Sequence, residues 1–285
     1  MKTGIKSSAY FHLYDYEQGF KTLRAHGYDA VDYQEFISMD SPLYSMGEDE
    51  LSCFLAKVAS AAEENGVQIY QVHAIWPTAG DDTEEGRQKS LWYYRRSILG
   101  AKHLGCKRVV VHPWMPHGWS NGTKEEFFEI NVRLMRELMP AARECNVYVC
   151  LENMPFRKGE TFSTVEEWLA VLQEVNDEHA KACLDTGHLE AMGVDPYVCV
   201  LAIKDYLEAM HVHDSRRAMD LHLFPYQGVL DWEAFVRGLR EIHFDGCIAL
   251  ETEVADGVPA PAKEPMQKAL ALLAKSIAAQ VELEQ

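Results

Sequence analysis

The stretch that decides the fold runs from residue 147 to residue 187 and reads VYVCLENMPFRKGETFSTVEEWLAVLQEVNDEHAKACLDTG. Two short apolar runs, 147–153 and 181–187, enclose an amphipathic segment near 163–176. A strand, a helix and a second strand in this order form a βαβ unit, whose two strands lie parallel in one sheet. The fold therefore depends on how often this unit recurs along the chain.

The same alternation runs through the whole chain. We predict eight strands, at residues 3–9, 30–36, 67–74, 108–113, 147–153, 181–187, 208–214 and 247–253. Helices are predicted at residues 15–26, 48–65, 84–104, 123–145, 163–176, 195–204, 231–241 and 260–282. Eight alternating units predict an α/β fold, a (β/α)₈ TIM barrel with a closed, parallel, eight-stranded sheet. An open doubly wound sheet is the competitor, but no GxGxxG follows the first strand to favour it.

A barrel of this kind takes about 250 residues, so the 285 residues are predicted to form one domain, 1–285. Residues typical of helix caps agree with the predicted helix boundaries. The segments Thr123-Lys-Glu-Glu and Ser163-Thr-Val-Glu resemble capping boxes, and Asp195-Pro196 places a proline in a first helical turn. Glycines that follow predicted helices, where a left-handed C-cap is wanted, are Gly27, Gly66, Gly105 and Gly246.

The charge balance excludes some partners. Asp and Glu outnumber Lys and Arg by 44 to 27, which gives a formal net charge of −17. Proteins that bind nucleic acid usually neutralise phosphates with clustered Lys and Arg, so we expect no nucleic-acid partner. We expect no membrane partner either, because no apolar run approaches the ~20 residues of a membrane span.

Compartment is inferred from the first residues and from the cysteines. The start, MKTGIKSSAYFHLYDYE, lacks an apolar signal core, and we expect a cytoplasmic protein. The chain has 7 cysteines, an odd number, and none of them forms a CxxC pair. They are predicted to be free thiols, mostly buried, in a reducing compartment.

Histidines and acids gather at the C-terminal ends of the predicted strands, which meet at one mouth of a barrel, where active sites form. The histidines are His73, His112, His188, His211, His213 and His222, and the acids are Glu152, Asp185, Asp214, Asp220 and Glu251. Glu152 and Glu251 each follow apolar strand residues, and a buried carboxylate is costly unless it is paired or bound to metal. We therefore predict a divalent-metal site. Mixed carboxylate and imidazole ligands suit Mn²⁺, Co²⁺, Zn²⁺ or Fe²⁺ better than Ca²⁺, with Zn²⁺ and Mn²⁺ as the leading candidates.

Several motifs at these strand ends carry a resemblance to a known family. They are VHP (111–113), LENMP (151–155), LDTGH (184–188), HVHD (211–214), DLH (220–222), GVLDW (228–232) and LETE (250–253). In this combination the chain resembles the xylose isomerase-like TIM barrels. That group contains sugar and sugar-phosphate isomerases and epimerases, and also the metal-dependent apurinic endonucleases (AP endonuclease family 2).

The resemblance implies roles for individual residues. A central metal would be held by Glu152, Asp185, His211 and Glu251. His188 would contact the substrate or bind a further metal. The extra ligands of an endonuclease-type trinuclear cluster are matched by His73, His112, Asp220 and His222, so one to three ions are expected. The resemblance is also compatible with a homo-oligomer.

Isomerisation beside a carbonyl needs a base, a Lewis acid and a group that returns the proton. We predict that Glu152 and Glu251 form this acid–base pair and transfer a proton through an enediolate. His188 and Arg217 are predicted to orient substrate hydroxyls, while Asp214 and His213 either orient the ligand imidazoles or serve packing. The residues predicted to line the pocket are His12, Tyr14, Trp76, Trp114, Trp119 and Phe156.

Four functions remain open at this stage. The first is a metal-dependent isomerase or epimerase of a small carbohydrate, and an unphosphorylated sugar is favoured because no phosphate-binding loop is evident. The second is an endonuclease IV-like phosphodiester hydrolase, which is opposed by the net charge and by the acidic segment AIWPTAGDDTEEG at 74–86. The third is a sugar or inositol lyase (dehydratase) that uses the same site. The fourth is a barrel that binds sugar or metal without catalysis.

Overall fold

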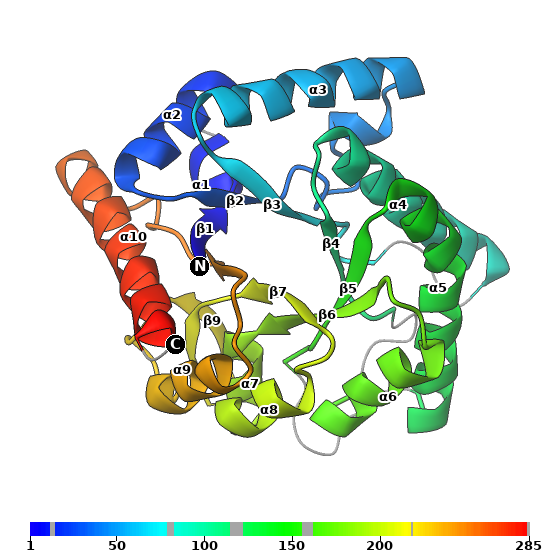
Figure 1. Ribbon diagram of the computed structural model, residues 1–285. Helices are drawn as coiled ribbons and strands as arrows, with labels where there is room; N and C mark the ends of the chain where they lie inside the picture. Colours follow the sequence, from blue (N-terminus) through cyan, green and yellow to red (C-terminus); the bar gives the residue numbers. More distant parts are fainter. Residues whose placement is uncertain (12–14, 79–82, 115–121, 156–161, 218, 284–285) are drawn as a thin grey trace.

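Eight parallel strands form the centre of the molecule, and helices form a ring around them (Figure 1). The computed structural model describes residues 1–11, 15–78, 83–114, 122–155, 162–217 and 219–283. The strands of the central sheet are β1 (Lys2–Lys6), β2 (Ala30–Tyr33), β3 (Gln68–His73), β4 (Arg108–Val111), β5 (Tyr148–Glu152), β6 (Ala180–Asp185), β7 (Leu207–His211) and β10 (Cys247–Leu250). They follow one another in the order β10-β1-β2-β3-β4-β5-β6-β7.

A short join closes the sheet between its first and last strands. Val212, directly after β7, pairs in parallel with Leu250 of β10. The N–H of Val212 donates to the carbonyl of Ala249 at 2.8 Å, and the N–H of Glu251 donates to the carbonyl of Val212 at 3.1 Å. The predicted TIM barrel is therefore confirmed.

The outer helices follow the predicted order. They are α2 (Tyr16–His26), α3 (Glu48–Glu64), α4 (Glu84–His103), α5 (Lys124–Cys145), α6 (Val165–Val175), α8 (Pro196–Ala202), α9 (Trp232–Glu241) and α10 (Ala260–Glu282). Smaller elements that the sequence analysis did not predict are α1 (Ser8–Phe11), the 3₁₀ turn η1 (Pro42–Tyr44), α7 (Thr186–Met192) and the hairpin β8 (Asp214–Arg216) with β9 (Met219–Leu223). None of the described helices is long and apolar enough to cross a membrane.

Side-chain capping explains most of the helix boundaries. The Thr123 hydroxyl accepts the N–H of Glu126, whose carboxylate accepts the N–H of Thr123, so the first predicted capping box is confirmed. The second is wrong by one residue, because Thr164 rather than Ser163 caps α6. Left-handed backbone is confirmed at Gly27, Gly66 and Gly105. It is not found at Gly246, since α9 ends at Glu241 and the left-handed residue that follows is His243, with φ 53°.

All eight predicted strands extend one to three residues too far at their C-terminal ends. The strand predicted at 3–9 ends at Lys6, and α1 begins at Ser8. The strand predicted at 181–187 ends at Asp185, because this carboxylate accepts the N–H of His188 at 2.8 Å and so begins α7. The strand predicted at 208–214 ends at His211, and the hairpin begins at Asp214. Short polar side chains that bond to nearby backbone N–H groups commonly end a strand in this way.

Small apolar residues fill the barrel below its mouth. One cluster joins Ala30, Tyr70, Cys247 and Ala249, and another joins Val110, Cys150, Cys183 and Ala209. All 7 cysteines are free, and 5 of them are buried, as predicted. Because side chains on one face of a strand recur every second residue, the next inward layer lies two residues further along each strand.

Candidate metal centre

The inward layer at the mouth is made of acids and histidines. Two residues beyond members of the apolar clusters stand Asp32, His112, Glu152, Asp185, His211 and Glu251. Each of the six is at most 8% exposed. The two-residue period of the strands therefore turns six polar side chains from six strands into the same enclosed space.

Four of these side chains converge as the sequence analysis predicted. One donor atom each from Glu152, Asp185, His211 and Glu251 lies within 4.8 Å of the others. Nδ1 of His211 lies 2.9 Å from Oε1 of Glu152 and 3.4 Å from Oε2 of Glu251. A single imidazole nitrogen thus faces both glutamates, which stand on β5 and just beyond β10.

The chemistry of this quartet fits a divalent cation. Three buried carboxylates at this separation have lost their hydration and repel one another. This arrangement is costly unless positive charge lies among them. Oε2 of Glu152 lies 2.9 Å from Nε2 of His112, yet no donor among the described residues is aligned on this buried oxygen. Three carboxylates and one imidazole are a donor set that Mn²⁺, Zn²⁺ and similar ions accept.

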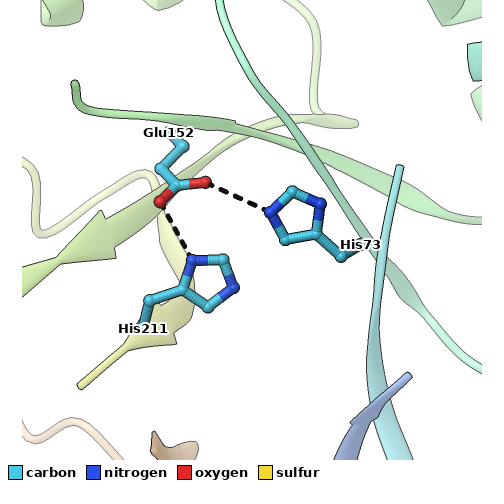
Figure 2. Close-up of side chains that lie close together, drawn as sticks. All are labelled: His73, Glu152 and His211. Carbon is cyan, nitrogen blue, oxygen red and sulfur yellow. Dashed lines mark hydrogen bonds and ion pairs between the residues drawn. The ribbon is translucent and has the colours of Figure 1, made fainter. Parts of the chain in front are cut away.

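Glu152 also belongs to a second group of donors. In Figure 2 it lies between His73 and His211, and each of its oxygens faces one of the two rings. Nε2 of His73 lies 3.7 Å from Oε2 of Glu152, and the three side chains have donor atoms within 4.8 Å of one another. Nδ1 of His73 is bonded to the carbonyl of Ala74 at 2.7 Å, which leaves Nε2 to face the site. Glu152 therefore belongs to two groups of candidate ligands.

The hairpin β8–β9 brings a third group of donors to the mouth. His213, Asp220 and His222 have donor atoms within 4.8 Å of one another. Oδ2 of Asp220 lies 3.3 Å from Nε2 of His222 and 3.3 Å from Nε2 of His188. His213 also contacts the central quartet, because its Nε2 lies 3.0 Å from Oδ2 of Asp185. The three groups together include seven of the nine predicted ligands, and His213 is an additional member. The other two predicted ligands lie beside them, with Nε2 of His112 2.9 Å from Glu152 and Nε2 of His188 3.3 Å from Asp220.

Two residues near the quartet were missed by the sequence analysis. Oδ2 of Asp32, on β2, lies 3.2 Å from Nε2 of His211. The amide of Gln34 donates to Oε1 of Glu251 at 3.0 Å and to Oδ2 of Asp32 at 3.2 Å. A signal was present, since Asp32 interrupts a β-branched and aromatic strand at its C-terminal end, as Glu152 and Asp185 do on theirs.

Mutual charge governs the protonation of these groups. Burial by itself would raise the pKa of Glu152, but His211 and His112 outweigh it and hold this pKa well below its ordinary value. Burial, with His112 and His211, lowers the pKa of His73, which favours the neutral ring that binds metal. For His188, burial is outweighed by Asp185 and Asp220, which raise its pKa to about 10. Imidazolium ions therefore balance the carboxylates where no metal does.

The predicted substrate-binding residues are placed differently from one another. His188 is buried in the first turn of α7, 3.7 Å from Glu152. Trp76 is half-buried, and its ring centroid lies 4.3 Å from that of His112. Trp114 is only 3% exposed, whereas Arg217 is exposed. The predicted pocket residues His12, Tyr14, Trp119 and Phe156 lie outside the described residues.

Asp214 proves to be a packing residue. Its carboxylate is buried and accepts the backbone N–H groups of Ser215 and Leu230 and the indole N–H of Trp232, at 2.9, 3.1 and 2.9 Å. These bonds tie the start of the hairpin to the start of α9. Two residues of the GVLDW motif, Leu230 and Trp232, thus bond Asp214.

Comparison with known sequences gives relatives of several activities. The chain is 27% identical over 207 residues to an uncharacterized protein of Methanocaldococcus jannaschii, covering 71% of this chain and 69% of that one. It is 29% identical over 126 residues to a D-psicose 3-epimerase of Enterocloster bolteae, covering 44% of this chain and 40% of the epimerase. A probable endonuclease 4 of Metamycoplasma arthritidis is 29% identical over 167 residues, covering 53% and 58%.

Solved structures share the fold over nearly the whole length. A D-tagatose 3-epimerase-like protein superimposes with a TM-score of 0.76 at 21% identity, covering 100% of this chain and 99% of the other. The IOLI protein with a bound zinc atom superimposes with a TM-score of 0.73 at 20% identity, covering 99% and 98%. A family model described as Xylose isomerase-like TIM barrel matches residues 20–276. The chain therefore belongs to the xylose isomerase-like TIM barrel family.

Proposed function

We propose that this protein is a divalent-metal-dependent isomerase or epimerase that moves a proton through an enediolate of a small carbohydrate. The observation that carries the proposal is the pair of glutamates at one nitrogen, with Nδ1 of His211 2.9 Å from Glu152 and 3.4 Å from Glu251. Two carboxylates that flank one site are what proton removal and proton return require. The sugar epimerases among the relatives support a carbohydrate as the substrate.

The quartet of Glu152, Asp185, His211 and Glu251 would hold the central cation, with Mn²⁺ or Zn²⁺ as candidates. The other two groups of donors, with His112 beside Glu152, would allow up to three ions. When bound, a divalent cation supplies a Lewis acid that stabilises negative charge on the oxygen of a substrate carbonyl. The zinc atom in the IOLI structure supports a divalent metal in this fold.

Proton transfer and substrate orientation are then assigned to side chains of the protein. One glutamate takes a proton from the carbon beside the carbonyl, and the other returns a proton to the opposite face or to the neighbouring carbon. We propose that His188 and Arg217 orient substrate hydroxyls. Trp76 covers His112 and would exclude water from one side of the substrate. We retain Trp114, Phe156 and His12 as proposed substrate contacts.

The direct test combines metal analysis with isotope exchange. Purified protein is expected to contain a divalent metal and to incorporate deuterium from solvent into one member of a panel of ketoses. A chelator should abolish the exchange, and the metal should restore it. Exchange that survives complete removal of metal would contradict the proposed role of the cation.

Variants test the glutamate pair itself. Glu152→Gln and Glu251→Gln should each abolish exchange while the fold persists. Glu253→Gln is the matched control, because Glu253 lies two residues beyond Glu251, is 42% exposed and pairs with Lys6 at 3.2 Å. Its exchange should equal that of the wild-type protein. Retained exchange in both site variants would eliminate the proposed acid–base pair.

A hydrolase of phosphodiesters is the second candidate. The observation that favours it is the third donor group, His213, Asp220 and His222, since clustered metal ions activate water in such enzymes. The probable endonuclease 4 among the relatives points the same way. The net charge of −17 opposes a nucleic-acid substrate. Cleavage of DNA with an abasic site at physiological salt, without deuterium exchange into any ketose, would reverse this ranking.

A further inference from the structure

The residues at the end of β2 connect two side chains of the proposed metal centre. Asp32 and Gln34 are two positions apart and are 1% and 6% exposed. The backbone N–H of Gln34 donates to the Ser7 hydroxyl at 2.8 Å, and the amide oxygen of Gln34 accepts the Ser8 hydroxyl at 3.3 Å. With its oxygen bonded to Ser8, the amide of Gln34 turns its NH₂ group towards the carboxylates.

The contacts from this amide form an unbroken chain between two proposed ligands. Nε2 of Gln34 donates to Oε1 of Glu251 at 3.0 Å and to Oδ2 of Asp32 at 3.2 Å. The same Oδ2 lies 3.2 Å from Nε2 of His211, within hydrogen-bond distance, although the N–H is not aligned on it. On the opposite edge of the imidazole, Nδ1 lies 3.4 Å from Oε2 of Glu251. The four side chains therefore form a closed ring of polar contacts.

This ring decides which atoms face the cation position. With a cation beside Nδ1, a carboxylate at Nε2 favours the His211 tautomer that carries its proton on Nε2, so the lone pair of Nδ1 is directed at the cation position beside Glu152 and Glu251. The amide occupies Oε1 of Glu251 and leaves Oε2 towards Nδ1. Each of the two residues thus presents one atom to the site.

Packing alone does not account for a carboxylate at position 32. Oδ1 of Asp32 is buried and has no hydrogen-bond partner among the described residues. A buried, incompletely bonded carboxylate is costly, and a neutral side chain of similar shape would avoid the cost. An imidazole that coordinates a cation offsets this cost, because its outward N–H becomes a stronger donor to a negative group.

We infer that Asp32 and Gln34 are positioning residues that hold His211 and Glu251 in the orientation that binds the cation and transfers the proton. The inference rests on the proposed metal-dependent function, which it deepens. Asp32 acts through the tautomer of His211. Gln34 acts through Glu251, because its amide bonds Oε1, links that oxygen to Asp32 and leaves Oε2 free to face the cation position.

The test compares Asp32→Asn and Gln34→Leu with the control Gln71→Leu. Gln71 is also buried in the barrel, but its amide donates to the backbone carbonyl of Met210 at 3.2 Å. Loss of a residue that orients a ligand commonly costs about 10–100-fold in metal affinity. We expect this loss for Co²⁺ or Zn²⁺ binding in Asp32→Asn. For Gln34→Leu we expect a loss mainly in kcat, with KM little changed.

A spectroscopic signal separates orientation from general damage. In the Co²⁺-loaded wild-type protein, the Nε2 proton of His211 should give a paramagnetically shifted, slowly exchanging proton resonance. Asp32→Asn should move or abolish this resonance, whereas Gln71→Leu should leave it in place. Thermal unfolding of each metal-free variant checks that the fold persists. If Asp32→Asn does not fold, Gln34→Leu carries the test, because it replaces one neutral side chain by another.

The outcomes distinguish this inference from the proposed function. Wild-type protein that binds no divalent metal would remove both. Wild-type protein that binds metal and exchanges deuterium, with Asp32→Asn unchanged in affinity and in the resonance, would remove the role of Asp32 alone. Equal kcat in Gln34→Leu and Gln71→Leu would remove the role of Gln34.

Discussion

Gly187 is the position where one added methyl group tests the geometry of the metal centre most sharply. Gly187 is the second residue of α7, directly beneath the ring of His213. An alanine Cβ there would lie 2.0 Å from Cε1 and 2.4 Å from Nδ1 of His213. Contact between such atoms is normally at about 3.5–4.0 Å, so the ring must move by roughly 1.5 Å.

The ring has no room for this movement. His213 is fully buried, its centroid stacks 4.2 Å from that of His222, and its Nε2 lies 3.0 Å from Oδ2 of Asp185. Overpacking costs about 1–3 kcal/mol, while alanine in place of glycine inside a helix gains about 1 kcal/mol. The net change in unfolding free energy is therefore small. The displaced Asp185 should nevertheless lower metal affinity by about 10–100-fold.

The assay measures metal affinity and thermal unfolding side by side in Gly187→Ala. We expect a large fall in affinity with a Tm decrease of no more than a few degrees. The matched control is Gly47→Ala, because a Cβ at this helix cap meets nothing within 4 Å and its φ is −63°. The control should bind metal as the wild-type protein does. Unchanged affinity in Gly187→Ala would refute the claim that His213 fixes Asp185.

Three further predictions concern metal, pH and packing. When the metal is present at about 100 times its Kd, its chelation should lower the free energy of unfolding by about 2.7 kcal/mol, which is a Tm decrease of roughly 5–10 °C. An unchanged Tm would contradict metal binding to the folded state. Opposing carboxylates raise the pKa of His188 to about 10 and of His222 to about 9, against burial. Their stabilisation of the metal-free fold is complete below their unfolded pKa of about 6.5 and is lost as pH rises through the folded values. A metal ion must displace these protons, so the increase in Tm on adding Zn²⁺ should grow between about pH 6 and about pH 8. An increase that does not change with pH would contradict the assignment of His188 and His222 as metal ligands. Asp214→Ala leaves buried N–H donors unpaired and should lower the free energy of unfolding in urea by about 2–4 kcal/mol. Trp232→Phe should lower it by less, and equal losses in the two variants would contradict these hydrogen bonds.

Hydrophobic periodicity was sufficient to predict the barrel. Apolar runs such as VVV at 109–111 mark strands buried on both faces, and amphipathic segments with capping residues mark the helices between them. One error in the strand boundaries lies where a polar side chain ends a strand. Asp185 has extended backbone, and its helix-capping role depends on the N–H of His188, three residues later. Strand propensity does not include that local competition.

The positions of the proposed ligands could be predicted for a related reason. The four ligands of the proposed central site stand towards the C-terminal ends of predicted strands, and parallel strands in a barrel bring those ends together. Asp32 was not predicted, because the strand predicted at 30–36 places it near the strand's start, whereas β2 ends at Tyr33. The hairpin that carries Asp220 and His222 to the mouth was not predicted. Its position depends on tertiary contacts of Asp220 with His188 and of His222 with His213.

What the sequence by itself determined is the order of strands and helices and the set of acids and histidines that face one mouth, because side-chain alternation is a local property of the backbone. The tertiary structure alone decided which atoms meet. The distances between strands depend on the stagger of the closed barrel, a collective property that no single segment encodes. That stagger places Nδ1 of His211 between Glu152 and Glu251, and turns its Nε2 to Asp32.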